Sequence, residues 1–210
     1  MKNFKRILVL APHTDDGELG CGGTISKYIE NGAEVHYAAF SVCEQSVPRH
    51  LPEDILEKEL KNACEILGIL SNRIHVFRYP VRRFDEFRQN ILDDLIRLKS
   101  EIDPELVFMP STFDTHQDHQ VISNEGFRAF KNCTLLGYEM PWNNPTFKTS
   151  CFSELKKNHI NSKVKAMNCY DSQAIRNYTN KDFIFSLAKV RGTQIKKEYA
   201  EAFEVFRVLF

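Results

Sequence analysis

The stretch Ile7-Leu-Val-Leu-Ala-Pro-His-Thr-Asp-Asp-Gly-Glu18 is the most informative part of this chain for predicting its fold. Its first part, Ile7 to Leu10, is a continuous apolar run, as expected for a parallel strand that is buried on both faces. Its second part places a histidine and three acidic residues directly after that strand. Residues 24–31 then predict a helix that ends at Gly32. The stretch therefore predicts a strand, a polar loop and a helix, which together form the first unit of an α/β fold.

The same alternation of strand and helix continues over the first two thirds of the chain. Further strands are predicted at residues 35–42, 74–77, 106–109 and 134–138, and helices at residues 52–67, 87–102 and 121–130. Strand–helix–strand alternation implies parallel strands with helices packed on the two faces of the sheet. We therefore predict a Rossmann-like open sheet, mostly parallel, with helices on both faces.

The last third of the chain has a less regular pattern. Helices are predicted around residues 162–170 and 182–189, and a final apolar-rich segment covers residues 202–210. A chain of 210 residues is of ordinary size for one domain. We predict a single domain over residues 1–210, in which residues 1–150 form the Rossmann-like core and residues 151–210 a less regular C-terminal part.

Composition and charge limit the possible partners of the protein. The chain is 42% hydrophobic and 27% charged, with a formal net charge of +0. Scattered basic residues and zero net charge argue against a nucleic-acid or anionic-membrane surface. No apolar run approaches the roughly 20 residues of a membrane helix, and the run at residues 7–12 is too short for a secretion signal. Six cysteines without a C-x-x-C pair favour free thiols and a cytoplasmic location.

Two polar loops are predicted to leave the same edge of the sheet, at residues 12–18 and 113–120. Ligands of open parallel sheets bind outside the carboxyl ends of the strands. Alone, the first loop could be a capped helix start and the second a polar surface loop. Together they supply two histidines and a carboxylate for a catalytic zinc, and a further histidine and aspartates for acid–base chemistry. These candidate residues are His13, Asp15, Asp16, His116, Asp118 and His119.

These loops also carry a resemblance to a known family. The run from Ala11 to Thr24 (APHTDDGELGCGGT) is similar to the signature of the PIG-L/LmbE-like zinc N-deacetylases, roughly A-H-P-D-D-E followed by L-G-C-G-G-T. The run His116-Gln-Asp-His119 resembles their H-P-D-H motif, and further similarities lie at Glu59 and Ser172-Gln173. The resemblance implies an enzyme that removes an acyl group, above all acetyl, from an N-acetylated sugar, nucleotide sugar or glycoconjugate.

The family resemblance implies one Zn²⁺ per chain, held by His13, Asp16 and His119. Fe²⁺ can occupy the same set of ligands. The chain departs from the family at Gly17, where glutamate is usual, and Glu18 follows one place later. This departure leaves all three proposed ligands in place and bears only on the role of the glutamate.

The resemblance also implies roles in catalysis. Asp15 would be the general base, His116 the acid or the electrophilic group, and Asp118 the carboxylate that orients and charge-stabilises His116. Arg49 and Trp142 are candidates for binding the substrate, because both follow predicted strands at the binding edge. Each of these two could equally be a surface or packing residue.

The glycines of the first motif (Gly17, Gly20, Gly22 and Gly23) do not have the G-x-G-x-x-G spacing of a dinucleotide-binding loop. We interpret them as allowing a close approach of the helix to the sheet, and we expect Cys21 among them to be packed. Two other functions stay open from the sequence. One is a metallo-hydrolase that acts on another amide or on an ester, and the other is a non-catalytic metal- or sugar-binding protein of the same fold.

Overall fold

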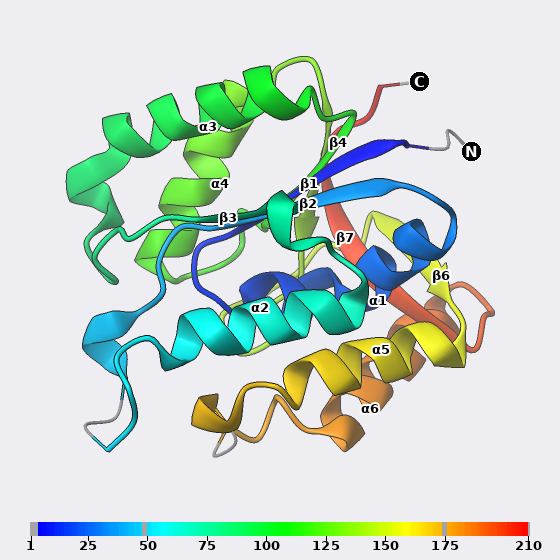
Figure 1. Ribbon diagram of the computed structural model, residues 1–210. Coiled ribbons are helices and arrows are strands. Elements are labelled where there is room, and N and C mark those ends of the chain that lie inside the picture. The colour runs from blue at the N-terminus through cyan, green and yellow to red at the C-terminus, as the bar shows by residue number, and fades with distance from the viewer. Residues whose placement is uncertain (1–3, 48–49, 174–175, 210) are drawn as a thin grey trace.

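The computed structural model describes residues 4–47, 50–173 and 176–209, which fold around one seven-stranded sheet (Figure 1). The strands are β1 (Arg6–Ala11), β2 (Glu34–Ala39), β3 (Ile74–Val76), β4 (Leu106–Pro110), β5 (Thr134–Tyr138), β6 (Cys151–Leu155) and β7 (Tyr199–Arg207). Their order across the sheet is β3-β2-β1-β4-β5-β7-β6. The first five strands in this order pair in parallel, and β7 pairs antiparallel with β5 and β6. The predicted open, mostly parallel sheet is confirmed.

Helices cover both faces of this sheet, as predicted. They are α1 (Asp16–Glu30), α2 (Ile55–Leu67), α3 (Arg88–Ile102), α4 (Gln117–Ala129), α5 (Lys157–Met167) and α6 (Lys181–Gln194). Short 3₁₀ helices lie at Glu44–Ser46, Ser71–Arg73, Phe84–Phe87 and Asp171–Gln173. Helices α3 and α4 pack on one face, and α1, α2, α5 and α6 pack on the other (Figure 1).

Strand β1 shows why its sequence is apolar throughout. Ile7, Val9 and Ala11 point into the core under α1 and α2, while Leu8 and Leu10 point into the core under α3 and α4. All five are at most 1% exposed. A strand between two helical layers has no solvent-facing side, so its sequence does not alternate between apolar and polar residues.

Helix α1 begins at Asp16, well before the predicted start at residue 24. Glycines lower the helix propensity of this segment, which is why the sequence pattern does not reveal its first turns. A Cβ atom on Gly20 would lie 2.4 Å from the ring of Tyr138 in β5, so only glycine allows α1 to approach the sheet this closely. Cys21 marks a kink in the helix, with φ of −145°, and is fully buried as predicted.

The C-terminal third is more regular than the sequence predicts. It contains two strands and two helices, and β7 runs between β5 and β6. The buried residue Glu201 interrupts the apolar pattern of β7. Its carboxylate accepts hydrogen bonds from Lys163 Nζ at 2.8 Å and from the amide of Thr24 at 2.7 Å. The sequence pattern therefore does not reveal this strand, because a charged residue with an internal structural role lies within it. That the chain forms a single domain stays a prediction.

The topology brings the two polar loops together. Strands β1 and β4 are neighbours, but the chain continues from β1 outward to β2 and from β4 outward to β5. The strand order thus reverses between β1 and β4, and such switch points are where open α/β sheets bind their ligands. The loops that follow β1 and β4 flank this point.

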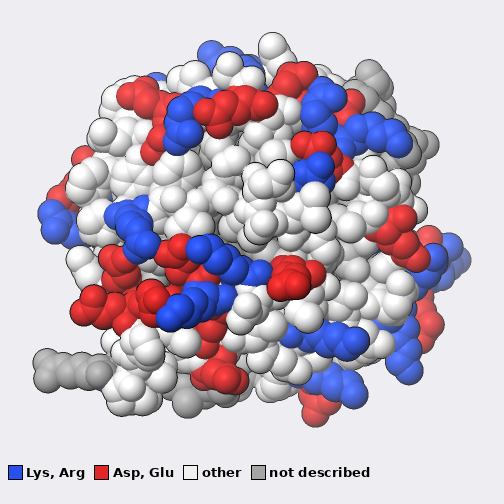
Figure 2. All heavy atoms as spheres, viewed as in Figure 1, with Lys and Arg blue, Asp and Glu red and all other residues white. Residues whose placement is uncertain are grey.

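The surface agrees with a neutral net charge. On the face shown in Figure 2, acidic and basic side chains lie next to one another, and no wide field of one sign appears. Among the described residues, no helix is both long enough and apolar enough to cross a membrane.

Candidate active site

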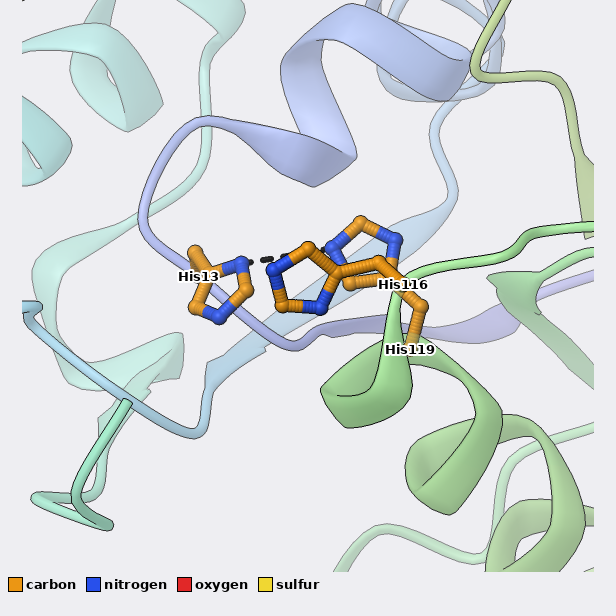
Figure 3. Close-up of side chains that lie close together, drawn as sticks. All are labelled: His13, His116 and His119. Atoms are coloured by element: carbon orange, nitrogen blue, oxygen red, sulfur yellow. Dashed lines mark hydrogen bonds between the residues drawn. The ribbon is translucent and has the colours of Figure 1, made fainter. Parts of the chain in front are cut away.

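Three side chains from the two loops meet at the carboxyl ends of β1 and β4. His13 follows β1, Asp16 is the first residue of α1, and His119 lies in the first turn of α4. Oδ2 of Asp16 lies 3.2 Å from Nδ1 of His13 and 3.2 Å from Nε2 of His119. The two ring nitrogens are also 3.2 Å apart (Figure 3). The three donor atoms therefore form a triangle with equal edges.

This triangle has nearly the size of one face of a coordination tetrahedron. Zinc binds imidazole nitrogen and carboxylate oxygen at about 2.0–2.2 Å, which places tetrahedral ligand atoms about 3.3–3.6 Å apart. The side chain of His116 lies close by, since ligand nitrogens of His13, His116 and His119 all lie within 4.8 Å of one another. The residues present thus fit a divalent metal ion.

A carboxylate holds each of the two histidines by its other ring nitrogen. Nδ1 of His119 lies 2.7 Å from Oδ2 of Asp114, and Nε2 of His13 lies 3.0 Å from Oδ2 of Asp118. Metal-binding histidines usually have such a partner, which fixes the ring and leaves the other nitrogen for the metal. Asp114 is not among the residues predicted from the sequence. The sequence could have indicated Asp114 by its position, because an aspartate often accepts a hydrogen bond from the backbone amide two residues later. Oδ1 of Asp114 accepts the amide of His116 in this way, at 2.9 Å.

The prediction that the Asp118 carboxylate orients His116 is wrong about its partner. Besides His13, the carboxylate accepts the amides of Arg82 at 2.6 Å and Phe84 at 3.3 Å. His116 is the N-cap residue of α4, and its Nδ1 accepts the backbone N–H of Asp118 at 3.2 Å. The side chain of Asp118 is directed instead toward the loop after β3. Asp118 therefore ties that loop to His13.

Charge around the triangle is predominantly negative. Burial alone would raise the pKa of Asp16, but His119 and His13 outweigh burial and hold that pKa below its usual range. Burial alone would lower the pKa of His119, but Asp16 and Asp114 outweigh it and raise the pKa to about 10. The pKa of His13 is also raised, because Asp118 and Asp16 outweigh the effect of burial. Three carboxylates face two imidazoles, an arrangement in which a metal cation would displace protons.

Asp15 lies in the same loop but has different contacts. It is the N-cap residue of α1, yet its side chain makes no capping hydrogen bond. Its Oδ2 is buried and has no hydrogen-bond partner in the described part of the chain, and Nη1 of Arg176 lies 3.6 Å away. Burial and then the charge of Asp16 raise the pKa of Asp15. The structure thus does not use Asp15 as a helix cap, and Oδ2, which accepts no hydrogen bond among the described residues, can accept a proton.

His116 presents a neutral ring to the site. Burial lowers its pKa to about 4, and the neighbouring rings of His119 and His13 add to this effect. Because Nδ1 accepts the Asp118 amide, the proton of the neutral ring resides on Nε2. The ring of His116 lies 4.9 Å from that of His13 between centroids. His116 can therefore donate one hydrogen bond next to the triangle.

A cavity of about 440 Å³ opens at these residues. Trp142 lines it, and its ring stacks on Tyr178 with the centroids 3.7 Å apart. Arg82 and Arg176 line it as well. Arg49, the other residue predicted to bind substrate, lies outside the described residues.

The C-terminal wall of the cavity is held by a buried carboxylate. Glu59 of α2 accepts the amide of Ser172 at 3.0 Å and its hydroxyl at 2.5 Å. This contact places Ser172 and Gln173 at the cavity. Glu59 and Ser172, which are similar to the family pattern, therefore form one structural contact.

The ring of Tyr37 occupies the space that a side chain at position 17 would need. A Cβ atom on Gly17 would lie 2.6 Å from the ring of Tyr37, so a glutamate cannot fit there without movement. Glu18 is fully buried and accepts the hydroxyls of Tyr37 and of Tyr170. Glu18 thus supports the first loop through these two tyrosines and does not line the cavity.

Comparison with known proteins agrees with this geometry. Residues 8–130 match the model of the PIG-L family, described as GlcNAc-PI de-N-acetylase. An uncharacterized deacetylase, YaiS, from Escherichia coli K12 is 28% identical over 177 residues, which is 80% of this chain and 91% of that protein. A probable N-acetyl-α-D-glucosaminyl L-malate deacetylase 2 from Bacillus anthracis is 26% identical over 220 residues, covering 96% and 89%. The fold is also that of GalB, the 4-carboxy-2-hydroxymuconate hydratase of Pseudomonas putida KT2440, with a TM-score of 0.81 at 21% identity and 98% of each chain covered.

Proposed function

Because the chain belongs to the PIG-L family of de-N-acetylases, we propose that it removes an N-acetyl group from an amino sugar or a sugar conjugate by metal-assisted hydrolysis. The observation that carries this proposal is the triangle of His13 Nδ1, Asp16 Oδ2 and His119 Nε2 at the floor of a cavity. Its two histidines have carboxylate partners on their far nitrogens, which supports their use as ligands.

These three residues would hold one divalent ion, with Zn²⁺ as the first choice and Fe²⁺ as the second. When bound, the metal would polarise the acyl carbonyl and lower the pKa of the attacking water. Asp16 is preferred to His116 as the third ligand, because one Asp16 oxygen contacts both imidazoles while Nδ1 of His116 is used by the Asp118 amide.

Asp15 and His116 would carry the proton transfers and the charge stabilisation. Oδ2 of Asp15, which has no hydrogen-bond partner among the described residues, would accept the proton of the attacking water and return it to the leaving amine as the C–N bond breaks. His116 would donate its Nε2–H to the acyl oxygen as negative charge develops there. Asp118 would act indirectly, by holding His13. Arg176 at 3.6 Å would keep the Asp15 carboxylate turned toward the cavity.

The substrate would be a small N-acetylated sugar, nucleotide sugar or glycoconjugate. The cavity has a volume in the usual range for such ligands, about 300–1,000 Å³, and the Bacillus anthracis relative has a name that specifies an N-acetylated glucosaminyl conjugate. Trp142, stacked on Tyr178, would form an apolar wall for the sugar ring. We also propose a cytoplasmic location, which the six free cysteines support.

An acetate-release assay tests the proposed function. The zinc-loaded protein is offered N-acetylglucosamine, its phosphates, its malate glycoside and a matched O-acetyl ester. We expect acetate from at least one amide, and no activity or bound metal in His119→Ala. His75→Ala, a histidine substitution on β3, is the matched control and should keep both.

The same assay separates the alternatives. Acetate from the ester with none from any amide would identify an esterase. Sugar binding without acetate from any compound, in protein shown to contain metal, would identify a binding protein and reject the hydrolase. Hydration of an unsaturated acid would point to the chemistry of the hydratase that shares the fold.

A further inference from the structure

Arg82 has an unusual backbone at the edge of the cavity. It lies in the loop between β3 and the 3₁₀ helix Phe84–Phe87, and its φ is 67°, in the left-handed region that favours glycine. Its amide is held by Oδ2 of Asp118 at 2.6 Å, the same oxygen that contacts His13. The position of Arg82 is thus fixed directly to the candidate metal site, although an arginine is an unfavourable residue for this conformation.

The side chain of Arg82 is also exceptional in its contacts. Within residues 4–47, 50–173 and 176–209, each other arginine contacts a carboxylate or a backbone carbonyl oxygen. The guanidinium of Arg82 has neither, and it lies exposed at the cavity. The neighbouring Arg83 instead forms an ion pair with Glu86.

These two observations together indicate that the side chain has a function. Strained backbone at a non-glycine residue persists where the surrounding structure enforces it, and such residues cluster at binding sites. A guanidinium without an acidic partner offers five N–H donors in a planar fork that matches a carboxylate or a phosphate. Arg176 lines the same cavity, but its guanidinium faces the carboxylate of Asp15.

We propose that Arg82 is a specificity residue that binds an anionic group, carboxylate or phosphate, on the N-acetylated substrate. This inference rests on the proposed function and deepens it, because it names the substrate class as anionic sugar derivatives. Asp118 holds the backbone of Arg82 and also contacts His13. The anion would therefore bind at a fixed distance from His13.

The test compares matched substrates in three variants. The substrates are N-acetylglucosamine, its 1-phosphate, its 6-phosphate and its malate glycoside, which separate a sugar phosphate from a carboxylate on the conjugate. The variants are Arg82→Gln, which removes the charge, Arg82→Gly, which relieves the left-handed backbone, and Arg83→Gln as the control. The kcat/KM ratio of each anionic substrate to the neutral sugar is measured, together with the thermal midpoint of each protein.

We expect the wild-type protein to favour one anionic substrate, and Arg82→Gln to reduce that preference about 10–100-fold, mainly through KM. Arg82→Gly should lose the same preference while its thermal midpoint stays equal or rises, which a merely structural role would not produce. Arg83→Gln should keep the wild-type preference.

Two results would overturn the proposal. One is a wild-type protein that hydrolyses neutral and anionic sugars alike, and the other is an anionic preference that survives in Arg82→Gln. If no substrate releases acetate, the proposed function fails, and binding decides on Arg82 separately. Glucosamine 6-phosphate should then raise the thermal midpoint of the wild type more than glucosamine does, and this difference should vanish in Arg82→Gln.

Discussion

Asp15 and Asp16 are adjacent in the sequence, yet their environments push their carboxyl groups in opposite directions. The contacts of Asp16 with two imidazoles lower its pKa, whereas burial and the charge of Asp16 raise the pKa of Asp15. Pairs of acids that are separated in this way commonly divide the roles of an active site. The arrangement favours Asp16 as the ligand and Asp15 as the base.

Substitution of these two residues tests the division of roles. Asp15→Asn keeps the shape of the side chain but removes its basic oxygen, so kcat should fall about 10²–10⁴-fold while metal content stays unchanged. Asp16→Asn should lose the metal as well as the activity. Elemental analysis of both proteins beside the kinetics is the measurement. Metal loss in the first variant and retention in the second would reverse the two assignments.

Glu18 shows a different effect at the residue scale. Burial raises its pKa to about 8, although hydrogen bonds from Tyr37 and Tyr170 oppose the shift. Both tyrosine hydroxyls contact the Glu18 carboxyl group. Each also contacts the carbonyl oxygen of Thr14, which lies 2.5 Å from the Tyr170 hydroxyl and 3.2 Å from the Tyr37 hydroxyl. Two hydroxyl protons cannot serve all these contacts. A proton on Glu18 supplies the missing hydrogen bond and leaves only the longest contact without one.

A protonated Glu18 has a consequence for stability. The folded protein holds this proton between the ordinary pKa of 4.5 and the folded pKa of about 8, where the unfolded chain has lost it. The free energy of unfolding should therefore fall as pH rises through this window. Glu18→Gln mimics the neutral acid and should remove that fall. Denaturant unfolding of both proteins at about pH 5 and about pH 9 measures the difference; parallel pH dependences would show that Glu18 is ionised.

Among the elements, helix α1 approaches strand β5 closely at Gly20, one of several glycines that α1 places against the sheet. Gly20→Ala would place a methyl group 2.4 Å from the Tyr138 ring, which is fixed by a hydrogen bond to the Leu10 carbonyl. We expect a loss of about 1–3 kcal/mol in the free energy of unfolding. Gly22→Ala is the matched control. Its methyl group would lie 3.1 Å from Cγ of Lys163, a milder contact, and the gain in helix propensity of about 1 kcal/mol opposes its cost.

Denaturant unfolding compares the two glycine variants with the wild type. Equal stabilities of Gly20→Ala and Gly22→Ala would contradict the close approach of α1 to β5.

The elements that could be predicted from the sequence are those whose environment is uniform along their length. Strand β5 has the predicted bounds, and α2 and α3 differ from prediction only at their first residues. The first turns of α1 are hidden by glycines that serve packing. Strand β7 is hidden by Glu201, whose charge is compensated by Lys163 and by amides of α1. In both cases a tertiary contact explains the residue, and local pattern carries no information about that contact.

At the scale of the whole molecule, the sheet topology explains which part of the site could be predicted. His13 and His119 lie far apart in the sequence. Their proximity could nevertheless be predicted, because ligands bind at the carboxyl ends of parallel strands and both loops lie there. The contacts of Asp114 and the change of partner for Asp118 depend on how α4 begins. The wall formed by Arg176 and Tyr178 depends on the path of the C-terminal third, for which the sequence offers no such rule.

A metal at this position would join two segments that lie far apart in the sequence, so its removal should lower the stability of the whole molecule. The loop after β1 and the start of α4 would share one ion through His13, Asp16 and His119. A ligand that binds only the folded state at about 100 times its Kd adds about 2.7 kcal/mol. For a chain of this size that corresponds to a rise of about 5–10 °C in Tm. We therefore expect EDTA to lower Tm by this amount and added Zn²⁺ to restore it, as followed by calorimetry. His119→Ala should show no response to either treatment, whereas an equal response in that variant would place the stabilising metal elsewhere.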